Sequence, residues 1–152
     1  MDLSREDFVQ LVRTGPLVSM DLIVRDDAGR VLLGLRINQP VRGFWFMPGG
    51  RIRKAELLDD AFARITQTEL GVTLSRADGR FMGVFEHLYD HNFAGVDGVG
   101  THYVVLAYEL RVAHLLGNLP ETQHDAYRWF WPLELLEAPG VHPYVKAYFG
   151  KE

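Results

Sequence analysis

Glycine, glutamate and arginine recur in a fixed order between Gly50 and Val72, and this order suits the binding of a metal–diphosphate. Glu56 follows the glycines, Arg64 comes next, and Glu69 closes the stretch. Glycines let a backbone approach a diphosphate closely, because they carry no side chain. Carboxylates on a following helix would supply the hard oxygen ligands that Mg²⁺ prefers. The segment therefore predicts a loop, a helix and a second loop around a divalent cation.

The same stretch has a purely structural interpretation, namely an amphipathic helix that follows a glycine turn. A single glutamate or glycine is most often structural, since charged residues are common at protein surfaces. The joint spacing of these residues makes the structural interpretation the weaker one. We therefore take the metal site as the leading hypothesis.

The segment resembles the Nudix box, in which a glycine, a glutamate, an Arg-Glu pair and a Glu-Glu pair stand in fixed register. Two positions depart from that pattern. Ile65 stands where most Nudix enzymes carry the glutamate after the arginine, and Thr68 stands at the first position of the Glu-Glu pair. In the family these carboxylates hold additional metal and often activate water for attack at phosphorus, and an isoleucine does neither. Two interpretations follow: a degenerate module that only binds, or an enzyme that uses another base for different chemistry.

Outside the box, the chain resembles the GDP-mannose mannosyl hydrolases, a divergent Nudix branch that lacks the same two glutamates. The resemblance extends over nearly the whole chain and is carried by Glu6-Asp7-Phe8, Pro16-Leu17-Val18-Ser19, GFWFMPGGR from Gly43 to Arg51, YDHNFAG from Tyr89 to Gly95, THYVVL from Thr101 to Leu106, and Gln123-His124-Asp125 leading to Tyr127-Arg128-Trp129. It favours the enzyme. It implies hydrolysis of GDP-mannose, and less selectively GDP-glucose, to GDP and free sugar, with inverting substitution at the anomeric carbon.

The resemblance also implies roles for individual residues. One Mg²⁺ per subunit, with Mn²⁺ as a possible substitute, would be held by the Gly49 carbonyl, Glu69 and the amide oxygen of Gln123. His124 would be the general base, and imidazole suits this role because its unperturbed pKa of about 6.5 leaves a basic nitrogen near pH 7. Attack at carbon needs fewer carboxylates, because the sugar carbon becomes oxocarbenium-like while negative charge builds on the departing diphosphate.

Further residues are implied at the substrate. Asp21 and Arg36 join His124 in the catalytic group, where Asp21 would bind sugar hydroxyls or orient Arg36. The residues expected to bind the substrate are Leu3, Phe8, Arg36, Arg51, Arg64 and Tyr103.

Several of these residues also have an ordinary structural interpretation, which stays open. An aspartate in a strand commonly pairs with a neighbouring arginine, as Asp21 would. For Arg64 we favour an ion pair with Glu56 over phosphate contact. A tyrosine in a strand, such as Tyr103, usually belongs to the core or to its rim. His87 is a lone histidine, which is usually structural, although its strand could turn it toward the pocket.

Helical and turn signals mark the elements that must position these residues. Ser4 is expected to begin a helix. Leu58, Ala61, Phe62 and Ile65 recur at helical spacing, which predicts a helix over 56–70 that Gly71 ends. Pro48-Gly49-Gly50 is expected to form a tight turn.

Strands alternate with these helices, which predicts an α/β (α+β) fold with a mixed sheet. The resemblance implies the Nudix α/β/α sandwich. The Val31–Arg36 strand is expected to pair with the first strand as a hairpin around Asp26-Asp27-Ala28-Gly29. The expected strands are Leu17–Arg25, Val31–Arg36, Phe44–Met47, Phe81–Leu88, Tyr103–Leu110 and Tyr127–Trp131, with short helices near 133–136 and 143–149.

Length and composition describe a small protein and exclude some function classes. The 152 residues fit one domain over 1–152. There is no apolar run near the roughly 18 residues of a membrane span, and the acidic, polar start does not resemble a signal peptide. Without cysteine the chain has no disulfides, which fits a cytoplasmic location. A net charge of −4 argues against nucleic-acid binding, and the resemblance implies a homodimer.

Overall fold

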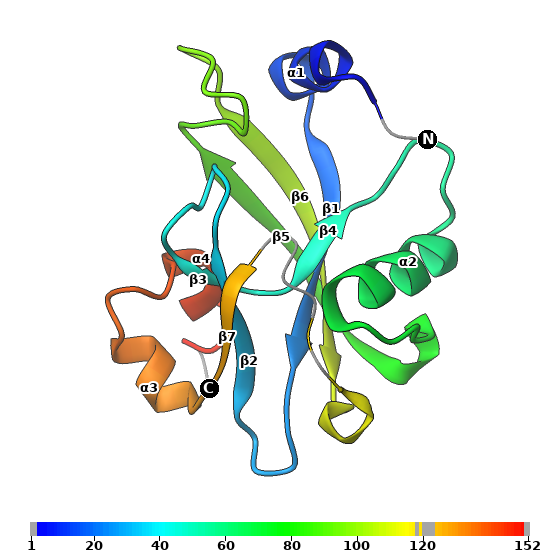
Figure 1. Ribbon diagram of the computed structural model, residues 1–152, viewed down its shortest axis with the longest axis vertical. Helices are drawn as coiled ribbons and strands as arrows, with labels where there is room; N and C mark the ends of the chain where they lie inside the picture. The colour runs from blue at the N-terminus through cyan, green and yellow to red at the C-terminus, as the bar shows by residue number, and fades with distance from the viewer. Residues whose placement is uncertain (1–2, 118, 120–123, 151–152) are drawn as a thin grey trace.

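Seven strands form two sheets that lie side by side in the computed structural model, which describes residues 3–117, 119 and 124–150, with the side chains of residues 124 and 125 left out (Figure 1). The larger sheet is mixed, because its two central strands are parallel and the other pairs are antiparallel. Its order is β4 (Gly49–Arg51), β1 (Leu17–Val24), β6 (Thr101–Leu110) and β5 (Gly79–Tyr89). The smaller, antiparallel sheet has the order β3 (Trp45–Phe46), β2 (Val31–Arg36) and β7 (His124–Phe130).

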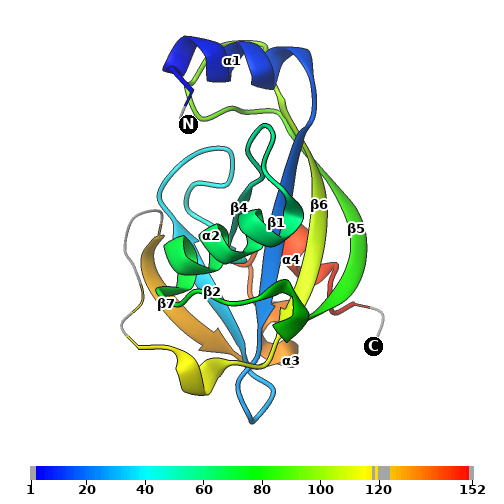
Figure 2. The ribbon, with the colours of Figure 1, turned by 90° about the vertical axis from the view of Figure 1, so that its right-hand side faces the viewer.

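Helices cover both sides of these sheets. Helix α2 (Leu58–Leu70) lies on one side, and α3 (Pro132–Glu137) and α4 (Pro143–Lys146) lie on the other, while α1 (Arg5–Thr14) sits at one end (Figures 1 and 2). Two short 3₁₀ turns, η1 (Arg76–Asp78) and η2 (Ala113–Leu115), complete the described elements. Ser4 caps α1 by accepting a hydrogen bond from the Asp7 N–H. Gly71 ends α2 in the left-handed conformation (φ 78°). The predicted mixed α+β architecture and both predicted helix ends are confirmed.

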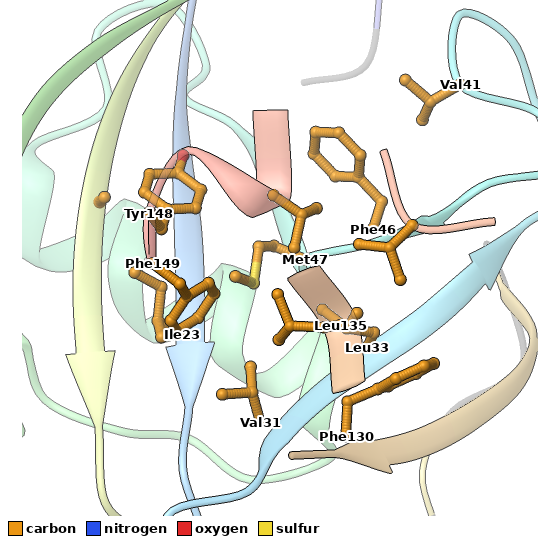
Figure 3. Packing of buried hydrophobic residues seen from close by; sticks show 13 residues of the cluster. Ile23, Val31, Leu33, Val41, Phe46, Met47, Phe130, Leu135, Tyr148 and Phe149 are labelled. Atoms are coloured by element: carbon orange, nitrogen blue, oxygen red, sulfur yellow. The ribbon is translucent and has the colours of Figure 1, made fainter. Parts of the chain in front are cut away.

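Two apolar clusters, one on each side of the sheets, form the core. Met20 and Leu22 of β1 belong to the cluster beneath α2, and Ile23 between Leu22 and Val24 belongs to the cluster beneath α3 and α4 (Figure 3). This alternation follows from the two-residue period of a strand. Because β1 is covered on both sides, seven of its eight residues are buried. The odd-numbered residue Asp21 therefore lies on the Ile23 side of the strand.

The predicted hairpin between the first two strands is wrong. Strand β1 pairs with β4 and β6, and β2 pairs with β3 and β7, so the two strands belong to different sheets. Only one antiparallel bridge, Arg25 with Val31, joins them next to the turn. The turn residues do reverse the chain, and Asp26 accepts hydrogen bonds from the backbone of Ala28 and Arg30. The strands then diverge, because each completes a separate sheet.

The predicted tight turn at Pro48-Gly49-Gly50 is also wrong. Gly49 and Gly50 begin β4, and neither has a positive φ. The glycines serve close approach instead: a Cβ at Gly49 would collide with the carbonyl oxygen of Met20, and a Cβ at Gly50 would lie 3.3 Å from Ile65 Cγ1. A glycine pair signals either use, and the sequence does not distinguish them.

No helix in the described part of the chain is both long and apolar enough to cross a membrane.

Candidate active site

A cavity of about 510 Å³ opens where α1, α2 and both sheets meet, and it gathers most of the predicted site residues. Asp21 comes from β1, Arg36 from the end of β2, and Tyr103 from β6. The predicted residues along its wall are Phe8, Asp21, Arg36, Gly49, Arg51, Arg64, Glu69 and Tyr103. The exception among the described residues is Leu3, which is 42% exposed and is not part of the wall. Gln123 and the side chain of His124 lie outside the described residues.

Glu69 and Gly49 meet where α2 packs against β4. The Gly49 N–H donates a hydrogen bond to Glu69 Oε1 at 2.9 Å, and the Glu69 side chain is buried, with 2% of its residue surface exposed. Asp21 is the Cα partner of Gly49 across the β1–β4 pair. The Glu69 side chain from α2 and Asp21 from β1 therefore both lie next to Gly49.

Asp21 is an unusual carboxyl group, because it is buried and forms no salt bridge with any described residue. Burial raises its pKa to about 7, and the negative charge of Glu69 adds to that rise. A hydrogen bond from Tyr148 and the positive charge of Arg36 lower the same pKa, but they offset the burial effect only in part. The Tyr148 hydroxyl donates to Asp21 Oδ2 at 2.6 Å.

The donor set fits a divalent cation. Asp21 and Glu69 are both buried, and the negative charge of Glu69 disfavours ionisation of Asp21, which a cation between them would relieve. Carboxylate and backbone carbonyl oxygens are the hard ligands that Mg²⁺ takes. Among the described residues, no three histidine or acidic side chains group together as a metal site. A third ligand such as Gln123 lies outside the described residues.

Arg36 places a hydrogen-bond donor in the wall that no described residue satisfies. Its Nε is buried, without a hydrogen-bond partner among the residues that the structure describes. Its backbone is the register partner of His124 in β7, so the start of β7 lies beside the cavity. A buried donor without a partner is costly, and an anionic ligand would satisfy it.

Arg64 forms the predicted ion pair with Glu56. Its Nε and NH2 groups contact the two Glu56 carboxylate oxygens at 2.7 and 2.9 Å, and NH2 also donates to the Arg51 carbonyl at 2.8 Å. Glu56 accepts another hydrogen bond from the Arg53 N–H. The hydrogen bond from Arg64 is the main reason that the pKa of Glu56 falls to about 2. The pair ties the loop before α2 to the helix. Contact of Arg64 with substrate stays a prediction.

Aromatic rings form the wall near α1. Phe8 of α1 stacks on Phe93 from the β5–β6 loop, with ring centroids 4.6 Å apart. The Arg51 guanidinium lies 4.8 Å from the centroid of Phe8. Both rings line the cavity, so Phe8 is a wall residue as well as a helix-packing residue. Phe93 was not singled out from the sequence, although it lies within the YDHNFAG stretch.

Tyr103 and His87 line the cavity from β6 and β5. Burial raises the pKa of Tyr103, so its hydroxyl keeps its proton and can donate a hydrogen bond. His87 was interpreted mainly as structural, and its ring does stack on Tyr144 at 4.3 Å. Burial lowers the pKa of His87 to about 4, so the ring is neutral at pH 7. It is therefore both a packing residue and a wall residue. Tyr89, which also lines the cavity, was not predicted.

Ile65 occupies the place of a glutamate in the resembled box, and it is a core residue. It is 1% exposed and packs against Gly50 in the cluster beneath α2. Ile65 also lines the cavity, so the wall has an apolar side chain where the resembled box has a carboxylate. Thr68, at the other departure from the box, lines the cavity and is exposed.

Comparison with known proteins assigns this arrangement to a family. Residues 15–149 match the family described as NUDIX domain. The chain belongs to the Nudix family. It is 41% identical over 145 residues to the low-salt glycan biosynthesis protein Agl8 of Haloferax volcanii, a match that covers 94% of this chain and 86% of Agl8.

Solved structures of Nudix proteins have the same fold. The MutT protein of Methanosarcina mazei Go1 has a TM-score of 0.70 and 20% identity, covering 91% of this chain and 94% of that one. The MutT Nudix hydrolase of Burkholderia pseudomallei has a TM-score of 0.65 and 25% identity, covering 90% and 98%. The predicted Nudix fold is confirmed, and so is the broad class, a Nudix hydrolase. Members of this class generally use a divalent metal.

Proposed function

We propose that the protein uses Mg²⁺ to hydrolyse GDP-mannose, and less selectively GDP-glucose, to GDP and free sugar. Water would attack the anomeric carbon rather than phosphorus. The observation that carries this proposal is that Ile65, in place of a carboxylate, lines the cavity next to Gly50. A helix without that carboxylate lacks the group that activates water at phosphorus in the resembled box. Glu69, Asp21 and Arg36 remain at the cavity and suit a reaction that places charge on a departing diphosphate.

The proposed step balances as a substitution at carbon. The water oxygen bonds to the anomeric carbon, the bond from that carbon to the β-phosphate oxygen breaks, and the bonding electrons leave with GDP. The proton from water passes to His124. Arg36 supports the departing diphosphate, because its buried Nε has no partner among the described residues. The Gly49 carbonyl, Glu69 and Gln123 would hold Mg²⁺, which would supply neutralising charge for the diphosphate.

The named relative supports a nucleotide sugar as substrate. Agl8 is a glycan biosynthesis protein by name, and glycan assembly consumes sugars activated on nucleotides. We further propose that the protein acts as a homodimer of single-domain subunits in the cytoplasm, in contact with neither membrane nor nucleic acid. Sedimentation over a concentration range tests the dimer.

Isotope labelling tests the site of attack. The protein is incubated with Mg²⁺ and GDP-mannose in heavy-oxygen water, and the products are identified by mass spectrometry. The proposal expects label in free mannose and unlabelled GDP. GMP and mannose phosphate, with label on phosphorus, would refute attack at carbon.

A second candidate function is a nucleotide-sugar module that binds without catalysis. The observation that favours it is the same absence of carboxylates at Ile65 and Thr68. The retained Gln123-His124 pair speaks for catalysis instead, because it keeps a candidate base. Tight binding of GDP-mannose, with no GDP released at any Mg²⁺ concentration, would favour the module.

A further inference from the structure

The segment after α4 packs against β1, and one of its side chains forms a hydrogen bond with Asp21. Tyr148 donates its hydroxyl hydrogen to Asp21 Oδ2 at 2.6 Å, across 127 positions of sequence. Neither the motif spacing nor the family resemblance points to Tyr148. The residue is not part of the cavity wall, so any influence on a bound ligand must pass through Asp21.

Packing holds the Tyr148 ring in place. It lies in the apolar cluster beneath α3 and α4 (Figure 3), where Phe85 meets it edge-to-face with ring centroids 4.6 Å apart. Tyr144, within α4, makes a separate contact with β5, where its hydroxyl accepts from the Leu88 N–H and donates to the Leu88 carbonyl. The phenol is therefore presented to Asp21 from a fixed position rather than from a free chain end.

The hydrogen bond has one direction. Burial and the adjacent Asp21 raise the pKa of Tyr148, so the phenol keeps its proton and acts as the donor. Asp21 Oδ2 is occupied by this bond. The other oxygen, Oδ1, lies on the Gly49 side, where a Cβ on the glycine would be 3.1 Å away. Since Asp21 lines the cavity, this arrangement leaves Oδ1 as the oxygen available to a ligand.

We propose that Tyr148 is a positioning residue, which fixes the Asp21 carboxyl so that Oδ1 accepts a hydrogen bond from a hydroxyl of the substrate's sugar. This inference rests on the proposed function, because it takes the sugar to lie beside Asp21. Without the Tyr148 hydroxyl, the carboxyl loses the contact that selects its orientation. Because the proposal places Asp21 at the sugar, we expect binding of the GDP part to be unchanged when the Tyr148 hydroxyl is removed.

Two matched substitutions test the proposal. Tyr148→Phe removes the hydroxyl and keeps the ring, and Tyr144→Phe removes the equivalent hydroxyl from the neighbouring helix α4, where it bonds to Leu88 instead. Hydrogen bonds to carboxylates are the stronger class, so kcat should fall about tenfold in Tyr148→Phe. Tyr144→Phe should retain kcat within about twofold, and the Kd for GDP, measured calorimetrically, should be unchanged in both variants. Equal losses of kcat, or weaker GDP binding in Tyr148→Phe, would show a general loosening of the site and overturn the proposal.

A double-mutant cycle separates positioning from independent effects. If Tyr148 acts through Asp21, adding Tyr148→Phe to Asp21→Asn should change kcat by less than about twofold. Multiplied losses would contradict the proposal. The cycle is run on the nucleotide sugar that the wild-type protein hydrolyses or, where it only binds, on the Kd for GDP-mannose. Release of GMP would therefore refute the proposed function, while the cycle would still decide the role of Tyr148.

Discussion

Glu56 in the loop before α2 and Asp21 on β1 are both shielded carboxyl groups, yet their surroundings are opposite. Glu56 is matched by the Arg64 guanidinium and has a pKa of about 2, whereas Asp21 has a phenol as its hydrogen-bond partner and a pKa of about 7. Asp21 lines the cavity and Glu56 does not. The Glu56–Arg64 pair therefore satisfies its charges internally, whereas Asp21 remains a polar group that a ligand can contact.

The largest expected effect tests whether His124 of β7, rather than Asp21 of β1, is the base. His124→Gln should lower kcat about a thousandfold, because general-base catalysis contributes on this order, while the Kd for GDP stays unchanged. His114→Gln, at an exposed histidine in η2, serves as control. Initial rates and calorimetric binding check the prediction. An unaltered kcat in His124→Gln would remove it as the base and leave Asp21 as the candidate.

The next effect concerns the carboxylate that links the two regions. Glu69→Gln should raise the Mg²⁺ concentration needed for half-maximal rate by at least about tenfold, because a neutral amide is a weaker ligand than a carboxylate. Glu86→Gln, at an exposed position of β5, is the matched control. Metal titrations of the initial rate measure both. Identical titration curves would exclude Glu69 from the ligand set.

The loop–helix region could be predicted from the sequence more fully than the surroundings of Asp21. The loop–helix region was predictable because its partners lie within one short stretch, so that spacing alone predicts the helix and the pairing of Arg64 with Glu56. The contact of Tyr148 with Asp21 joins the last part of the chain to the first strand, and only the tertiary fold creates it. The family resemblance supplied eight residues of the cavity wall, whereas others, such as Tyr89 and Phe93, were found only in the fold.

The wrong predictions of a hairpin between the first two strands and of a tight turn at Gly49 have a similar physical origin. Asp26 and Gly29 mark a chain reversal correctly, but sheet membership depends on which distant strands compete for pairing. At Gly49 the sequence signal was real, and its cause was the nearby carbonyl of Met20 rather than a positive φ.

Removing the charge of Glu56 tests whether its ion pair with Arg64 stabilises the fold. Glu56→Gln should lower the free energy of unfolding by about 2 kcal/mol at pH 7, because a part-buried arginine loses its charged partner. The surface pair of Asp59 and Arg76 gives the control, since Asp59→Asn should cost less than about 0.5 kcal/mol. Urea unfolding measures both variants. A loss of activity without a loss of stability would instead favour contact of this region with substrate.

The pH dependence of stability should differ in sign between the two carboxyl groups. The folded-state pKa of Glu56 is depressed, so its stabilisation is present above pH 4.5 and is lost as the pH falls toward about 2. The folded-state pKa of Asp21 is raised, so its contribution is present below pH 3.8 and is lost as the pH rises through about 7.

Asp21→Asn therefore gives the smallest and most discriminating effect on stability. The amide keeps the shape of the side chain and cannot ionise, so the variant should gain on the wild type as the pH rises from 4 to 8. At pH 8 it should be more stable by about 1 kcal/mol, although its kcat is reduced. Urea unfolding at both pH values, with a chelator present to remove metal, measures the difference. A variant that is less stable than the wild type at pH 8 would mean that the Asp21 carboxylate is well paired in the folded protein, and the contrast with Glu56 would disappear.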